Sequence, residues 1–83
     1  MTHRVRPAYA CMATTNVVKA VVENLTHNEC RIEADYEVGT VQVFDGDAIV
    51  YRALQKGEGQ PWIVSCFNSQ RIQWDNTGDV FEQ

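Results

Sequence analysis

The sequence has few positive charges and no long apolar segment. Seven Lys and Arg residues stand against eleven Asp and Glu residues, so the 83-residue chain carries a formal net charge of −4. This deficit argues against nucleic acid as a ligand and against anionic membranes, because both are bound through clustered Lys and Arg. No apolar run approaches the roughly 20 residues that cross a bilayer. The basic N-terminus also lacks the apolar stretch of a secretory signal. We therefore expect no association with a membrane.

Cysteine and histidine are also scarce. Three cysteines, Cys11, Cys30 and Cys66, are an odd number for a disulfide framework, so we expect reduced thiols and a cytoplasmic protein. His27 and Cys30 have the spacing of half a zinc site, and Cys11 and Cys66 are the residues that would complete it. However, no second close pair exists, and cysteine on a strand face commonly packs as a small hydrophobic residue. We predict no metal and no cofactor.

Catalytic signatures are missing as well. The chain has no Gly-x-Ser-x-Gly, no phosphate-binding glycine loop and no His-Glu-x-x-His. A cysteine nucleophile needs a histidine base within hydrogen-bonding reach, and the chain offers only His3 and His27. We expect no catalytic residues and a non-enzymatic protein.

The hydrophobic pattern predicts the element order β-α-β-β-β-β. From Cys30 to Val38, apolar and charged residues alternate with period two, as in a strand with one buried face. Residues 15–27 place four valines and Leu25 on one side of a helix, with Thr14 or Thr15 as N-cap. A hairpin turn is expected at Asp45-Gly46-Asp47 and a loop at 56–61. The remaining strands are expected at 8–12, 40–44, 48–55 and 62–67, with a short one at 71–74.

This order predicts a single compact α+β domain over residues 1–83. One amphipathic helix packs on a mostly antiparallel, curled sheet of four to six strands, forming two layers. The acidic segment from about residue 75 is expected to be frayed.

One helix cannot cover all of the predicted sheet. The strands at 48–55 and 62–67 are apolar on both faces, whereas a helix about 18–20 Å long and ~10 Å wide covers roughly three strands. Three arrangements would bury the remainder: the sheet curls into a half-barrel, two copies pair face to face, or another protein binds the exposed side.

Two groups of residues are therefore candidates for partner binding, and they favour a small interaction module that regulates or inhibits another macromolecule, as a monomer or a homodimer. The acidic group would suit a basic groove on a nucleic-acid-handling protein, since complementary charge speeds docking. The apolar group would bind a protein partner or a second copy. The acidic group is Glu33, Asp35, Glu37, Asp45 and Asp47; the apolar group is Val50, Leu54, Ile63, Phe67 and Trp74.

The alternative function is single-stranded nucleic-acid binding by the sheet. Proteins of this class stack bases on aromatic side chains beside Arg and Lys. The C-terminal strands carry such a mixture, but only three cations lie in this region, and the net charge opposes it. The residues that would act are Tyr51, Arg52, Trp62 and Arg71.

Overall fold

The computed structural model describes residues 7–75 and the backbone of residues 80–82. These residues form one helix and seven strands, and the predicted order β-α-β-β-β-β is confirmed for the first six elements. The elements are β1 (Tyr9–Ala13), α1 (Thr15–His27), β2 (Arg31–Asp35), β3 (Thr40–Asp45), β4 (Ala48–Gln55), β5 (Trp62–Cys66), β6 (Ile72–Trp74) and β7 (Val80–Glu82).

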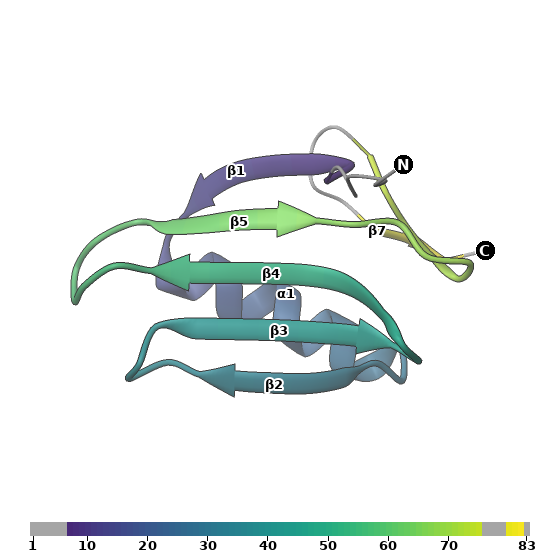
Figure 1. The fold of residues 1–83 in the computed structure, drawn as a ribbon, viewed down its shortest axis with the longest axis horizontal. Helices are drawn as coiled ribbons and strands as arrows, with labels where there is room; N and C mark the ends of the chain where they lie inside the picture. The colour runs from purple at the N-terminus through teal and green to yellow at the C-terminus, as the bar shows by residue number, and fades with distance from the viewer. Residues whose placement is uncertain (1–6, 76–79, 83) are drawn as a thin grey trace, which may run out of the picture.

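The first five strands form one antiparallel sheet in the order β1-β5-β4-β3-β2 (Figure 1). Strands β2 to β5 follow one another as a meander, and β1 joins the sheet beside β5. Because β1 and β2 are the two edges, the intervening helix α1 has to cross from one edge to the other. It does so across a single face, which confirms the predicted two-layer α+β architecture (Figure 1).

Helix α1 is defined by its cap and its apolar stripe. The Thr14 side chain accepts a hydrogen bond from the backbone N–H of Val17, as an N-cap does. Val18, Val22 and Leu25 are buried, and they recur at the three- to four-residue spacing of one helix face. Packing of these residues has to stabilise the helix, since β-branched valines lower its intrinsic propensity.

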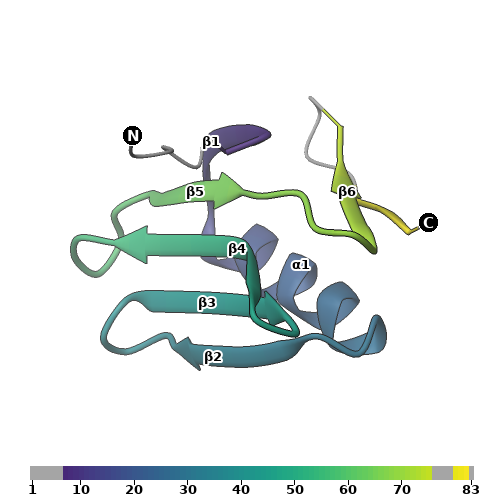
Figure 2. The same ribbon diagram turned by 45° about the vertical axis from the view of Figure 1, so that its right-hand side comes forward.

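The core lies between α1 and the sheet, and Trp62 is its largest member. Trp62 is fully buried, and its indole N–H donates to the Thr15 hydroxyl at 2.9 Å, which ties β5 to the start of the helix. The short strand β6 completes this layer, because the Trp74 ring stacks on Tyr51 at 5.8 Å between centroids. Figure 2 shows β6 and α1 on the same side of the sheet.

The predicted strand at 30–38 is shorter in the structure. It ends at Asp35, whose carboxylate accepts hydrogen bonds from the backbone N–H groups of Glu37 and Val38 and so turns the chain. Val38 is consequently exposed instead of buried. Gly39 completes the turn with φ of 90°, and a Cβ there would lie 2.5 Å from the Gln55 carbonyl oxygen. Alternation alone overestimated the length of this strand, because it does not detect a side chain that accepts backbone hydrogen bonds and so ends the strand.

A short strand lies within the segment predicted to be frayed. Val80–Glu82 forms β7, which pairs antiparallel with β6. Residues 76–79 and 83 of that tail lie outside the described residues. A three-residue strand gives too short a pattern for alternation to detect.

No further strand among the described residues pairs with β1 or β2, the two edges of the sheet. The helix-side face is covered by α1 and β6, whereas none of the described helices and strands lies in front of the opposite face in Figure 1. Within residues 7–75 and 80–82, no helix has the length and hydropathy needed to cross a membrane.

Candidate functional site

The uncovered side of the sheet, called here the open face, consists of two rows of residues that cross all five strands. Trp62 points toward α1, so its neighbour Ile63 points to the opposite side. The strand register then places the cross-strand partners of Ile63 and Ser65 on that same side. All members are exposed except Ser65, which is half-buried. In order from β1 to β2, the rows are Met12, Ile63, Leu54, Thr40 and Asp35, and Ala10, Ser65, Arg52, Gln42 and Glu33.

The β1 end of the open face is apolar. Met12 pairs with Ile63, and Ile63 pairs with Leu54, so three aliphatic side chains stand side by side on adjacent strands. Their exposed fractions are 71%, 47% and 45%. Full burial of an aliphatic side chain is worth about 1.5–3 kcal/mol, so covering even half of these three is a substantial driving force for association.

The β2 end of the open face is acidic. Glu33 and Asp35 point outward beside Thr40 and Gln42, and together with Leu54 these residues line a shallow depression. Arg31 forms an ion pair with Glu33, so the local excess of negative charge comes from Asp35. Along this face, the chemistry therefore changes from aliphatic at β1 to carboxylate at β2.

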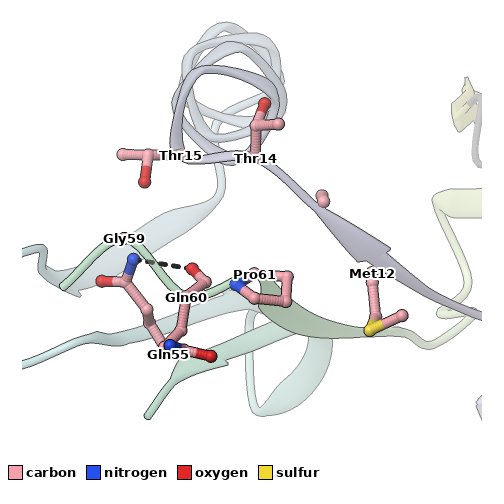
Figure 3. A pocket seen from close by; sticks show the side chains of 8 residues that line it. Met12, Thr14, Thr15, Gln55, Gly59, Gln60 and Pro61 are labelled. Atoms are coloured by element: carbon pink, nitrogen blue, oxygen red, sulfur yellow. Dashed lines mark hydrogen bonds between the residues drawn. The ribbon is translucent and has the colours of Figure 1, made fainter. Parts of the chain in front are cut away.

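A second hollow continues the apolar end beyond the sheet (Figure 3). It lies between the β1–α1 junction and the β4–β5 loop, with Met12, Ala13 and Pro61 among its lining residues. Gln55 stiffens its far wall by donating a hydrogen bond to the Gln60 carbonyl oxygen at 2.9 Å (Figure 3). A ligand that covers Met12 and Ile63 could therefore extend into this hollow.

The structure divides the predicted apolar group. Leu54 and Ile63 are adjacent on the open face, but Val50 and Trp74 are buried in the core. Phe67 is half-buried, and its N–H donates to the Val50 carbonyl oxygen. Val50 and Trp74 therefore do not belong to this surface, and Phe67 follows the last paired residue of β5, beyond the two rows.

Met12 is the apolar residue that sequence reasoning missed. It lies in a predicted strand, and alternation with Cys11 already placed it on the opposite side from that cysteine. The pattern could not reveal that β1 pairs with β5, which is what sets Met12 beside Ile63.

The predicted acidic group is divided as well. Glu33 and Asp35 share the open face, whereas Glu37 and Asp47 are exposed in turns outside its two rows. Asp45 is engaged within the fold. Its carboxylate accepts hydrogen bonds from the Ser69 hydroxyl at 2.6 Å and from Arg71 at 3.1–3.2 Å, which fixes the approach to β6.

Stability is expected to depend on pH through Asp45. The Ser69 hydrogen bond lowers the pKa of this carboxyl most, burial opposes it, and Arg71 lowers it further. A folded-state pKa below the unfolded value contributes stability that is complete above the unfolded pKa and is lost as pH falls through the folded pKa. The urea midpoint should therefore fall below about pH 4. The fall should be shallower in Asp45→Asn, and equal slopes for the two proteins would contradict this assignment.

The aromatic residues proposed to stack on nucleic-acid bases are not accessible on the surface. Tyr51 and Trp62 are buried under α1 and β6, while Arg52 points to the opposite side of the sheet. Arg71 binds Asp45 and also donates to the Asn28 carbonyl oxygen at 2.7 Å. These four side chains therefore form no shared surface for stacking bases.

The residues of the alternative zinc site are not brought together either. Cys11 lies on edge strand β1, whereas Cys30 directly precedes the opposite edge, β2. Within the part of the chain that the structure describes, no three His, Cys, Asp or Glu side chains cluster as metal ligands would. The Cys30 sulfur instead lies 3.9 Å from the Arg71 guanidinium.

Comparison with known proteins adds no relative. No family model matches the chain, and neither a curated protein nor a solved structure is significantly similar to it. The functional argument therefore rests on the geometry of the open face.

Proposed function

We propose that this chain is a non-enzymatic protein-binding module and that the open face is its binding surface. The observation that carries the proposal is the exposed row of Met12, Ile63 and Leu54, which continues into the carboxylates of Glu33 and Asp35. The partner is a folded protein whose own surface places an apolar patch beside Lys or Arg residues. Such a partner would bury the aliphatic row and meet the acidic end with opposite charge.

Charge favours a different protein over a second copy of this chain. In a symmetric dimer the same surface packs against itself. Two open faces brought together with like ends aligned would set Glu33 and Asp35 against the same residues of the other copy. Aligned the other way, the carboxylates would meet the aliphatic row. Arg31 already pairs with Glu33, so the carboxylate that neither arrangement supplies with a facing cation is that of Asp35, whereas a partner with a basic patch supplies one.

The proposed role is that of a regulator or inhibitor that occupies the partner's surface. Nucleic-acid-handling proteins are a suitable class of partner, because they carry basic surfaces. A reducing compartment such as the cytoplasm suits the three cysteines, which form no disulfide with one another.

The double variant Leu54→Ser/Ile63→Ser is expected to lose at least tenfold in partner affinity, because it removes the centre of the apolar row. Partners captured from a lysate of the source cells would be identified, purified and titrated by calorimetry against each variant. Both positions are exposed, so urea unfolding should remain within about 1 kcal/mol of the unchanged chain.

Val38→Ser is the matched control. Val38 is 69% exposed but lies in the turn after β2, outside the open face. Its affinity for the partner should stay within twofold of the unchanged chain. Capture that depends equally on Val38 and on Leu54 would contradict the proposal. Light scattering that shows a dimer of the chain, broken by the double variant, would instead assign the open face to self-association.

A further inference from the structure

A small cavity of about 100 Å³ lies on the helix side of the sheet, remote from the open face. Strands β1, β4 and β5 form its floor, α1 forms one wall, and β6 forms another. Its lining is mostly aliphatic, aromatic or sulfur-bearing, and includes Cys11, Val17, Val21, Tyr51, Cys66 and Trp74. Val17 is half-exposed at its rim, so a small molecule has a route of entry beside the helix.

Tyr51, one of the residues that line this cavity, carries a buried hydroxyl without a hydrogen-bond partner among the described residues. Its side chain is 1% exposed, and within the described part of the chain its hydroxyl is the buried side-chain polar atom left unsatisfied. Most buried polar groups in proteins are satisfied, and an exception calls for an explanation such as a ligand or a water. The ring is held in place by stacking against Trp74, so the hydroxyl has a defined direction.

Two titratable groups in the lining of this cavity, Cys66 and Tyr51, are neutral. Burial, and then the nearby Cys11, raises the pKa of Cys66 to about 12. Burial also raises the pKa of the Tyr51 hydroxyl, with further contributions from Cys66 and Cys11. The Cys66 thiol and the Tyr51 hydroxyl are therefore protonated near neutral pH. A charged ligand would therefore be desolvated here without a countercharge.

We propose that this cavity binds a small, neutral, largely apolar molecule that accepts one hydrogen bond from the Tyr51 hydroxyl. A cavity of about 150 Å³ takes up benzene, so one of about 100 Å³ encloses about four non-hydrogen atoms. A ligand of about five or six such atoms would place the remaining one or two at the open rim. Small ketones, aldehydes and esters belong to this class. This site is independent of the proposed protein-binding function, because it lies on the opposite side of the sheet.

Cyclopentanone and methylenecyclopentane are the probes that test this site. They share a ring, but only the ketone accepts a hydrogen bond. Titration of the full chain, followed by the indole N–H resonance of Trp74, is expected to show saturable binding of cyclopentanone in the millimolar range. In Tyr51→Phe, the ketone should lose about fivefold in affinity, which is the usual worth of one hydrogen bond. The affinity of Tyr51→Phe for methylenecyclopentane should differ by less than twofold from that of the unchanged chain.

Three results would contradict the proposed binding site. One is that cyclopentanone shows no saturable binding, and another is that Tyr51→Phe loses equal affinity for both probes. The third result is that the probes shift the indole N–H resonances of the two tryptophans equally. The control Val38→Ser, remote from the cavity, should bind both probes like the unchanged chain.

The stability of Tyr51→Phe tests the same hydroxyl without any ligand. An unsatisfied buried hydroxyl destabilises the fold, so its removal is expected to raise the folded-to-unfolded ratio by about fivefold. Urea unfolding at neutral pH measures this change. A decrease in stability would show that the hydroxyl is already satisfied, for example by a fixed water, and would count against a vacant binding group.

Discussion

Replacing Trp62 by alanine is expected to lower the free energy of unfolding by about 3–5 kcal/mol. The side chain is fully buried between the sheet and α1, and its ring meets Tyr36 edge-on at 6.0 Å. The substitution leaves a cavity and also frees the Thr15 hydroxyl, which accepts the indole N–H. A domain of this length has a total stability of only about 4–12 kcal/mol. Urea titration followed by circular dichroism should therefore show a midpoint shifted far toward lower urea.

Two further variants separate volume from the hydrogen bond. Trp62→Phe keeps most of the ring volume, so its free energy of unfolding should fall less than that of Trp62→Ala. Thr15→Ala keeps the ring and removes only the acceptor, with an expected cost of about 1–3 kcal/mol for the unpaired indole N–H. If Trp62→Ala unfolded at the same urea concentration as the unchanged chain, the placement of Trp62 at the centre of the core would be wrong.

Arg71→Ala is expected to lower the free energy of unfolding by about 2–3 kcal/mol, the range for hydrogen bonds to charged groups. The guanidinium joins three parts of the chain. It binds the Asp45 carboxylate at the end of β3 and the Asn28 carbonyl oxygen after α1, and it directly precedes β6. Without it, Asp45 loses its cation and β6 loses its attachment, so Trp74 should pack less firmly on Tyr51. Urea unfolding measures the cost, and near-ultraviolet circular dichroism measures the aromatic packing.

Arg31→Ala is the matched control for Arg71→Ala. Arg31 also pairs with a carboxylate, but both partners, Arg31 and Glu33, are more than half exposed. Exposed ion pairs contribute roughly 0–1 kcal/mol because solvent screens them. Equal losses for the two arginine variants would contradict a special role for Arg71 in holding β6.

The two faces of the sheet separate the two proposals experimentally. Leu54 and Ile63 lie on the open face, whereas Tyr51 and Cys66 point toward α1. Substitutions on one side therefore leave the other side's contacts intact. A failure of partner binding in Leu54→Ser/Ile63→Ser carries no consequence for the binding of cyclopentanone.

The local elements follow from residue patterns that can be read in the sequence. Helix α1 begins and ends where the valine spacing, Thr14 and His27 place it, and β4 begins directly after the predicted turn at Asp45-Gly46-Asp47. These features depend on side chains a few residues apart, so periodicity and capping are sufficient to find them. The assignment of Leu54 and Ile63 to opposite sides from Ala53 and Val64 followed from the same alternation.

Which of these residues form an exposed surface depends on contacts between distant parts of the chain. Val50 and Tyr51 are consecutive in β4, yet both are buried, next to the register shift between Val43 and Phe44. Trp74 is drawn into the core because Arg71 and Asp45 position β6 over the sheet. The open face itself requires β1 to pair with β5, a contact between residues about fifty positions apart. Long-range pairings of this kind depend on the packing of the whole chain, and no local pattern encodes them.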